Sequence, residues 1–305
     1  MDRRRFLALS SAAFLAQHLP PRTFGLPRIL RGPAESTVFE TSCVTFESVT
    51  SLFDAVGGLQ TLLPVEPRNA TIVLKPNLCL PDGPLKATTT SPNLVELICR
   101  KLIADGVRKI VIVDHTLQRT PDFDRTPWPD LPRKYPEVKL LLANEERFYE
   151  PITLDGKVLK RTDILRVLPK ADLFVNIPTA KHHSATHVSL GLKNLMGTIW
   201  NRSDFHSSMD LDKAVADLAI AVRPTLTIVD ASRVLLRGGP TGPGPILTEN
   251  RLFASRDILA VDAIVSSRYS FGGMSLSPTR IPHLAAALEL GVGELDPDRI
   301  RVQRV

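Results

Sequence analysis

Short runs of apolar, β-branched residues recur along the chain, and longer segments of helical periodicity lie between them. Continuous apolar runs of this length predict strands that are buried on both faces, at residues 71–75, 109–114, 138–143, 172–177 and 225–230. Apolar positions three and four apart predict helices at 92–105, 211–222, 258–269 and 282–290. Strands that alternate with helices indicate an α/β fold with a mainly parallel sheet flanked by helices.

Two irregular segments interrupt this alternation. Residues 115–137 are rich in Pro, Asp and Arg, which favours a long surface loop. Residues 238–245 are only Gly, Pro and Thr and predict a turn or a lid. We expect a single α/β domain over residues 32–305.

Polar side chains follow four of the predicted strands where each strand ends. They are Lys75 with Asn77, Asp114, Lys181 and Asp230. In open α/β sheets, ligands bind in the crevice outside the carboxyl ends of the strands. We therefore expect these residues to converge on one ligand crevice, the alternative being that each only caps its strand or the next helix.

Residues 181–206 hold four of the seven histidines: His182, His183, His187 and His206. His183 and His187 are four apart, so on a helix they would share a face suited to a divalent transition metal. No carboxylate completes an HExxH arrangement, and Gly191 with Gly197 favours a loop over a regular helix. Metal binding at this pair is thus one of two functional interpretations, and a solvated basic loop is the alternative without a site.

The other functional interpretation is an anion or carboxylate site. Lys181 and Lys193 supply positive charge, imidazoles donate hydrogen bonds, and the amides of Asn77 and Asn194 orient the ligand. A histidine beside a lysine has a lowered pKa and can act as a base near neutral pH. Alternative nucleophiles are Ser184 or Ser189 beside a histidine, and Lys193 as a Schiff-base lysine where it is desolvated.

The N-terminus reads as a targeting segment. Arg3-Arg4-Arg5-Phe6-Leu7 precedes an apolar run that is too short to span a bilayer, and the pattern resembles a twin-arginine export signal. We expect residues 1–31 to be signal and linker, the twin-arginine translocase to be a partner, and the protein to be periplasmic or extracellular without a stable membrane anchor. A cytosolic protein with a basic amphipathic N-terminus is the alternative.

Charge and composition change this picture little. The net charge is +6, but six arginines against one aspartate within residues 1–31 account for nearly all of it. With no basic stripe interleaved with aromatics in the remainder, we expect no nucleic-acid partner. The chain is 43% apolar and 23% charged, which excludes a disordered or disulfide-dense protein.

Cys43, Cys79 and Cys99 have no CxxC spacing. A cluster bound by the chain normally needs four thiolates, so we expect no iron–sulfur cofactor. An exported chain could still form one disulfide that includes Cys43 or Cys79.

The order of these motifs resembles the bacterial and archaeal domain-of-unknown-function 362 family. The match runs over residues 70–293, and its specific centre is Pro178-x-x-Lys181-x-His183 followed by Leu192-Lys193-Asn194-x-x-Gly197. The resemblance implies an α/β fold and, in many members, a fused ferredoxin-like domain whose cluster cysteines this chain lacks. It implies site positions at Lys75, Asn77, Asp114, Lys181, His183, Lys193, Asn194, His206, Asp230, Asp257 and Asp262, but leaves His182 and His187 outside the pattern.

We expect an exported enzyme that binds a small anionic substrate and transfers protons, as a racemase or isomerase does. The candidate catalytic residues are His183, His206, Lys193 and Asp114. The candidate substrate-binding residues are Lys75, Asn77, Lys181, Asn194 and Asp230. The crevice is similar to that of lactate racemases in ligand type and fold class only.

Two alternatives stay open. One is a metal-dependent hydrolase with His183, His206 and an aspartate as ligands of a divalent metal. The other is a non-catalytic periplasmic protein that binds a ligand or a metal.

Overall fold

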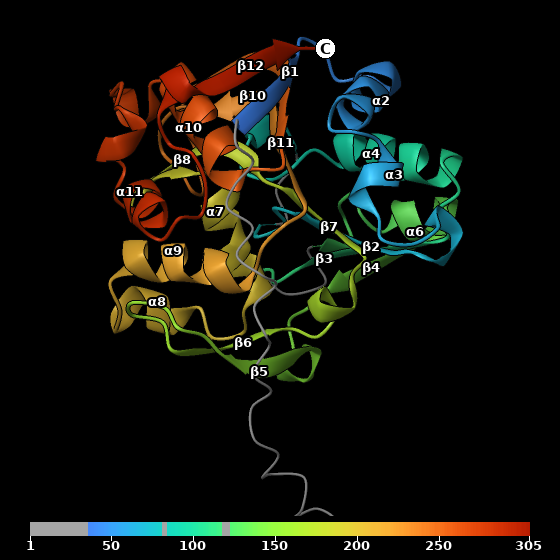
Figure 1. The fold of residues 1–305 in the computed structure, drawn as a ribbon, viewed down its shortest axis with the longest axis horizontal. Helices are drawn as coiled ribbons and strands as arrows, with labels where there is room; N and C mark the ends of the chain where they lie inside the picture. The colour runs from blue at the N-terminus through green and yellow to red at the C-terminus, as the bar shows by residue number, and fades with distance from the viewer. Residues whose placement is uncertain (1–35, 81–83, 118–122) are drawn as a thin grey trace, which may run out of the picture.

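The centre of the structure is a mostly parallel sheet built from the predicted strands. A computed structural model describes residues 36–80, 84–117 and 123–305 (Figure 1). The parallel strands are β2 (Thr71–Pro76), β3 (Lys109–Asp114), β4 (Val138–Leu142), β7 (Leu173–Ile177) and β10 (Leu226–Leu235). The predicted helices are α4 (Pro92–Ala104), α9 (Leu211–Ala221), α10 (Ile258–Arg268) and α11 (Pro282–Glu289). The predicted α/β fold with helices flanking the sheet is confirmed.

Besides a hairpin that is attached to β10, three further strands extend the sheet beyond the prediction. They are β1 (Ser36–Thr41), β11 (Ile246–Ser255) and β12 (Ile300–Arg304), and the sheet order is β12-β1-β11-β10-β7-β2-β3-β4. β11 is antiparallel to both β10 and β1, whereas β12 is parallel to β1. The first half of β11 is exposed and all of β12 after Ile300 is exposed, so neither carries the continuous apolar run by which buried strands are recognised.

Successive side chains of each strand face opposite sides of the sheet, which creates two hydrophobic cores. On β2, Ile72 and Leu74 pack in one core with α2 (Phe46–Ala55) and α4, while Val73 packs in the other. Figure 1 shows α2 and α4 on one side of the sheet and α9, α10 and α11 on the other. Burying one such aliphatic side chain contributes about 1.5–3 kcal/mol, so strand burial on both faces stabilises the sheet strongly.

The chain order reverses between β2 and β7. From β2 the chain proceeds outward to β3 and β4, and β7 then pairs on the opposite edge of β2, followed by β10. Lys75 at the end of β2 lies beside Asn176 of β7. Such a reversal opens a crevice at the carboxyl ends of the two strands. The topology therefore puts the ends of β2, β3 and β7 around one opening.

The histidine-rich stretch is a series of short elements. It contains β8 (Thr179–His183), β9 (His187–Ser189), α7 (Gly191–Asn194), a 3₁₀ turn at Leu195–Thr198 and α8 (Ser203–Ser207). β8 and β9 form a hairpin in which His183 lies opposite His187. The two histidines are therefore cross-strand partners, and the helical face considered for them does not exist.

The remaining elements lie outside the main sheet. They are α3 (Leu59–Leu62), α6 (Asp130–Lys134) and the hairpin of β5 (Tyr149–Thr153) and β6 (Arg161–Leu165). α6 interrupts the predicted loop at residues 115–137, and the loop at 238–245 is irregular, as expected, between β10 and β11. The predicted signal at residues 1–31 lies outside the described residues.

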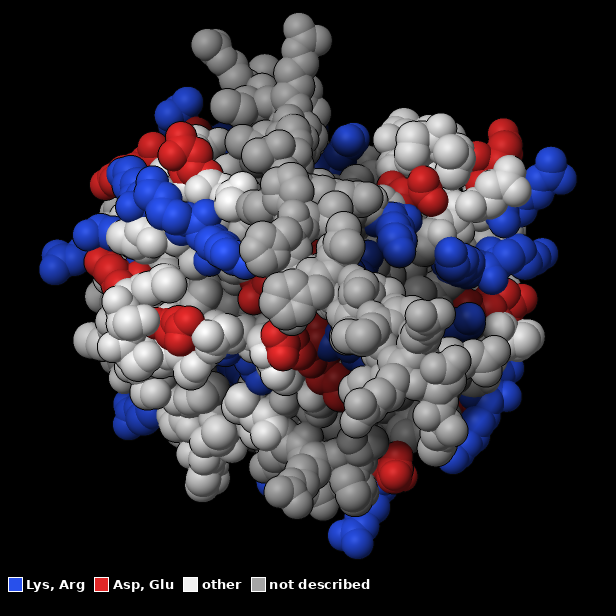
Figure 2. All heavy atoms as spheres, turned by 90° about the horizontal axis from the view of Figure 1, so that it is seen from below, with Lys and Arg blue, Asp and Glu red and all other residues white. Residues whose placement is uncertain are grey.

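The described surface carries charges of both signs. On the uncovered part of the face seen in Figure 2, basic and acidic groups are interspersed around the rim. Within the described ranges, none of the helices has both the length and the apolarity needed to cross a membrane.

Candidate functional site

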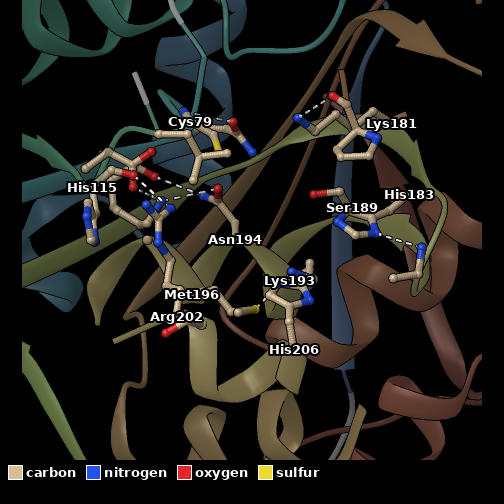
Figure 3. A pocket seen from close by; sticks show the side chains of 18 of the residues that line it. Cys79, His115, Lys181, His183, Ser189, Lys193, Asn194, Met196, Arg202 and His206 are labelled. Atoms are coloured by element: carbon tan, nitrogen blue, oxygen red, sulfur yellow. Dashed lines mark hydrogen bonds and ion pairs between the residues drawn. The ribbon is translucent and has the colours of Figure 1, made fainter. Parts of the chain in front are cut away.

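A cavity of about 760 Å³ opens at the carboxyl ends of the strands that flank the chain reversal. The predicted site residues that line it are Lys75, Asn77, Asp114, Lys181, His183, Lys193, Asn194 and His206. Figure 3 shows His115 and Arg202 on one side of this cavity and Lys181, His183 and Ser189 on the other. The fold thus brings together side chains that are more than a hundred residues apart in sequence.

Asp257 and Asp262, which the family resemblance adds, do not line the cavity, and neither does the predicted substrate-binding residue Asp230. One carboxylate oxygen of Asp230 accepts the backbone N–H of Ser91 at 2.7 Å, and the other accepts the N–H and the hydroxyl of Ser232 at 3.0 and 2.6 Å. Burial raises its pKa, and these hydrogen bonds oppose the rise. Asp230 therefore anchors the start of α4 to β10.

Lys75 and Asp114 form a buried ion pair in the wall of the cavity. Lys75 Nζ lies 2.8 Å from Asp114 Oδ1, and the side chains are 1% and 2% exposed. Asp114 Oδ2 also accepts the N–H of Leu78 at 2.6 Å. Burial lowers the pKa of Lys75, and the Asp114 carboxylate opposes this. Because each charge is compensated by the other, this pair contributes little net charge to a ligand.

Asn194 fastens α7 to the two strands at the reversal. Its side-chain nitrogen donates to Asn176 Oδ1 at 2.8 Å and to the carbonyl of Lys75 at 3.3 Å. Its Oδ1 accepts from Lys75 Nζ at 3.2 Å. Both the nitrogen and the oxygen of the Asn194 amide therefore bond to protein groups, although the sequence analysis assigned this amide to a ligand.

Asp262 fixes the other end of α7. Its two carboxylate oxygens accept the N–H groups of Gly191 at 2.7 Å and Leu192 at 2.9 Å. Burial raises the pKa of Asp262 to about 7, against the lowering effect of the two backbone hydrogen bonds. The neighbours of Lys193 in the chain, Leu192 and Asn194, are therefore both held by hydrogen bonds to residues outside α7.

The glycine of the Leu-Lys-Asn-x-x-Gly motif makes room for the ion pair. A Cβ at Gly197 would overlap Asp114 Oδ1 and come within 2.6 Å of Lys75 Nζ. The motif is therefore explained by close approach of the turn after α7 to the ends of β2 and β3.

Lys193 is only 9% exposed, and its Nζ donates to the thioether sulfur of Met196 at 2.9 Å. A thioether is a weak acceptor. The pKa of Lys193 is lowered to about 8, mainly by burial; Arg202 and Lys181 contribute to the lowering, and Cys79 and Asp212 oppose it. Among the residues that the structure describes, no carboxylate is paired with this ammonium group.

Lys181 is held by backbone carbonyls. It donates to the carbonyls of Thr88 at 2.5 Å and Pro240 at 3.2 Å. These contacts connect the loop at residues 238–245 to β8, and Pro240 itself lines the cavity.

His183 is a neutral imidazole with its proton on the cavity side. Its Nδ1 accepts the N–H of Ala185 at 3.1 Å, so the single proton of the neutral ring is on Nε2. The pKa of His183 is lowered to about 3, mainly by burial, and the charges of Lys193 and Lys181 contribute to the lowering. Figure 3 shows the Nδ1 contact on the outer side of the ring and the other nitrogen turned inward. His183 is thus a hydrogen-bond donor at neutral pH.

His115 has the opposite tautomer. Its Nδ1 lies 3.0 Å from the carbonyl oxygen of Ile199, which can only accept, so Nδ1 carries the proton and Nε2 has a lone pair. The ring stacks on Trp200 with centroids 5.2 Å apart. Burial lowers the pKa of His115, as does the nearby Arg202. The cavity therefore holds one imidazole that donates and one that accepts.

The sequence interpretation did not select His115, Arg202 or Trp200, which all line the cavity. Arg202 donates to the carbonyls of His115 at 3.1 Å and Thr116 at 3.3 Å. A signal for His115 was present, since it directly follows Asp114 at the end of β3. Arg202 lies within the histidine-rich stretch, so its position in the sequence was the available signal.

The metal interpretation finds no ligand set in the described part of the chain, where no group of three His, Cys, Asp or Glu could hold a metal ion. His187 has a positive φ of 63° and does not line the cavity with His183. His206 lines the cavity, and its side chain is exposed. Partial desolvation and the charge of Lys193 lower its pKa. Asp114, the aspartate available as a third ligand, is paired with Lys75.

The serine and cysteine interpretations also have structural outcomes. Ser184 and Ser189 line the cavity, but neither hydroxyl is hydrogen-bonded to a histidine in the described ranges. Cys43, Cys79 and Cys99 are free thiols, and Cys79 is at the cavity wall.

Comparisons with known proteins agree with the family resemblance. The family model described as domain of unknown function (DUF362) matches residues 72–267. The thylakoid-associated protein sll1697 of Synechocystis sp. (strain ATCC 27184 / PCC 6803 / Kazusa) is 24% identical over 256 residues, covering 80% of this chain and 74% of that protein.

A solved structure with similarity to the chain is the lactate racemase apoprotein from Thermoanaerobacterium thermosaccharolyticum. The TM-score is 0.43 and the sequence identity 15%, over 88% of this chain. The chain spans 61% of the length of that racemase.

Proposed function

This chain belongs to the family of domain of unknown function 362, and we propose that its cavity is the active site of an enzyme that transfers protons on a small anionic substrate. The observation that carries the proposal is the pair of neutral imidazoles, His115 and His183, whose tautomers are opposite and which lie on opposite sides of the cavity (Figure 3).

The charge of the cavity supports an anionic substrate. Lys75 is compensated by Asp114, but Lys193 and Arg202 contact a thioether and backbone carbonyls instead of carboxylates. Within the described ranges neither charge has a carboxylate partner, and charges at a partly desolvated cavity wall attract a carboxylate or a phosphate more strongly than the same charges in water. We assign Lys193 and Arg202 to the anion, in place of the pair Lys181 and Lys193.

The two imidazoles supply the acid and the base. His115 Nε2 accepts a proton from the substrate carbon, and a proton returns from the other side through His183 Nε2–H, whose own proton is restored from solvent. A base and an acid on opposite sides of a carbon are the requirement for inversion of configuration or for a 1,2-proton shift. Racemase or isomerase chemistry is thus favoured, with His115 taking the role that the sequence suggested for His206.

The experiment is hydrogen–deuterium exchange at carbon. A panel of small 2-hydroxy, 2-amino and 2-oxo carboxylates is first tested for binding by isothermal titration calorimetry. Each acid that binds is incubated with the full chain in D₂O. Loss of the C2 proton of the 2-hydroxy and 2-amino acids, or of the C3 protons of the 2-oxo acids, is followed by ¹H NMR. His115→Gln and His183→Gln should each slow exchange by about 10²–10⁴-fold while the Kd of the anion changes little.

His182→Gln is the matched control, because His182 lies on the same hairpin but does not line the cavity. Exchange that persists in His115→Gln and stops in His206→Gln would move the base to His206. Binding without exchange for every acid would make the chain a binding protein, and exchange that requires an added divalent metal would favour the hydrolase alternative. No binding by any acid would remove the anion site.

Export remains part of the proposal. Arg3-Arg4-Arg5-Phe6-Leu7 before a short apolar run supports twin-arginine transport to the periplasm or beyond. Arg3→Lys with Arg4→Lys should retain the protein in the cytoplasm, measured by cell fractionation with an antibody to the chain. Unchanged export of the double variant would reject this route.

A further inference from the structure

We infer that Lys193 is a nucleophile whose amine forms an imine with the carbonyl carbon of a 2-oxo acid. The inference rests on the proposed function, because it assigns a substrate class and a covalent step to the same cavity.

The three lysines of the cavity differ in what their ammonium groups contact. Lys75 is paired with a carboxylate, and Lys181 is bound by two carbonyl oxygens. Lys193 contacts the Met196 sulfur at 2.9 Å and has no oxygen acceptor among the residues that the structure describes. A weak acceptor orients the amine without stabilising its charged form, so Lys193 is the lysine from which a proton is most easily removed.

The position of Lys193 is fixed before any ligand binds. Asp262 holds the two N–H groups on one side of it, and Asn194 bonds to β2 and β7 on the other. A nucleophile supported in this way loses little freedom on reaction, as an active-site residue requires.

The surroundings of Lys193 keep part of the amine free at neutral pH. Its pKa is lowered to about 8, mainly by burial; Arg202 and Lys181 contribute to the lowering, and Cys79 and Asp212 oppose it. His183, His206 and His283 are near enough for the Lys193 charge to contribute to lowering their pKa values. At pH 7 roughly a tenth of the amine is therefore unprotonated, far more than for an exposed lysine.

The covalent step balances with the groups present. The Nζ lone pair attacks C2 of the oxo acid, and the electrons of the C=O bond move to oxygen, which takes a proton from the attacking nitrogen. Solvent supplies a second proton to the departing oxygen, to which His183 Nε2–H donates a hydrogen bond, and the C–O bond breaks and water leaves. Amine, oxo acid and one proton thus become an iminium ion and water, and no oxidant or reductant is needed.

The iminium ion gives Arg202 and His115 their roles in the reaction. The iminium keeps the positive charge of Lys193 while Arg202 faces the carboxylate. Electron withdrawal by the iminium acidifies the C–H bonds at C3, where His115 Nε2 removes a proton to give an enamine. The substrate class is therefore a 2-oxo acid with at least one hydrogen on C3.

The test is reductive trapping on the full chain. Pyruvate or 2-oxobutanoate is added with sodium cyanoborohydride, which reduces an iminium to a stable secondary amine, and modified lysines are located by peptide mass spectrometry. Modification should be confined to Lys193, with Lys75 and Lys181 as internal controls. Lys193→Arg should bind the acid without being trapped, and lactate, which has no carbonyl group, should leave the wild type unmodified.

Two results overturn the inference while leaving proton transfer intact: pyruvate that binds by calorimetry but leaves Lys193 unmodified, or labelling spread evenly over all lysines. If no 2-oxo acid binds, the substrate class is wrong, and deuterium exchange on the other carboxylates decides the proposed function separately.

Discussion

Replacement of Lys193 by methionine should stabilise the protein while it abolishes anion binding. Methionine matches the length and unbranched shape of the lysine side chain and removes its charge. The pKa of Lys193 falls from its ordinary 10.5 to about 8, and the largest cause is burial. Since each pKa unit corresponds to about 1.36 kcal/mol, the native state bears a cost of about 3 kcal/mol for holding this charge at pH 7.

The sign of the pH dependence follows from the same shift. The folded pKa is below the unfolded one, so the cost is fully present below pH 8 and disappears as pH rises from 8 to 10.5. Lys193→Met should therefore be up to about 3 kcal/mol more stable than wild type at pH 7, a rise in Tm of about 5–10 °C. At pH 10.5 the two proteins should differ little.

The assay is urea unfolding of both proteins at pH 7 and pH 10.5, followed by circular dichroism. Lys75→Met is the matched control and should be less stable by about 3–5 kcal/mol, because it leaves Asp114 buried without its partner. A Lys193→Met variant that is less stable than wild type at pH 7, or equally shifted at both pH values, would refute the reasoning. The expected gain would mean that stability is sacrificed for function at this position.

Three further changes separate the ligand-binding groups from the supporting ones. Affinity of the wild type for a small carboxylate should fall as pH rises through about 8, because Lys193 loses its charge, and calorimetry on Lys193→Arg should show no such fall. Asp230→Asn should cost about 1.5–3 kcal/mol in thermal unfolding, through its hydrogen bonds to Ser91 and Ser232, without a change in anion Kd; weakened binding would contradict the purely anchoring role. Gly197→Ala should lose about 1–3 kcal/mol, because the new methyl group displaces the pair of Lys75 and Asp114; wild-type stability would show that the turn yields freely.

β2 and β3, which were predicted, differ from β11 and β12, which were missed, in how much of each strand is buried. β2 is buried along its whole length and β3 at all but its first residue, so a run of apolar residues identifies each of them from local sequence. β11 and β12 are partly or mostly exposed, and their strand character depends on pairing with β10 and β1. Pairing between distant segments has no signature in a short window of sequence.

Asp114 and Asp230 show the same limit at the site. Both are aspartates at the ends of buried strands, and the sequence gives them the same interpretation. In the structure Asp114 faces Lys75 and the cavity, whereas Asp230 turns to the start of α4. Strand register and the path of the following chain decide between these outcomes.

The sequence by itself determined the α/β class, the central strands, the family and the region of the cavity. These depend on apolar periodicity and on the rule that strand ends carry the ligand crevice, both of which are local or topological. Only the tertiary structure decided that Lys75 and Asn194 support the site and that His115 and Arg202 join it. Those roles depend on which donor meets which acceptor, and contacts between residues far apart in the chain exist only after folding.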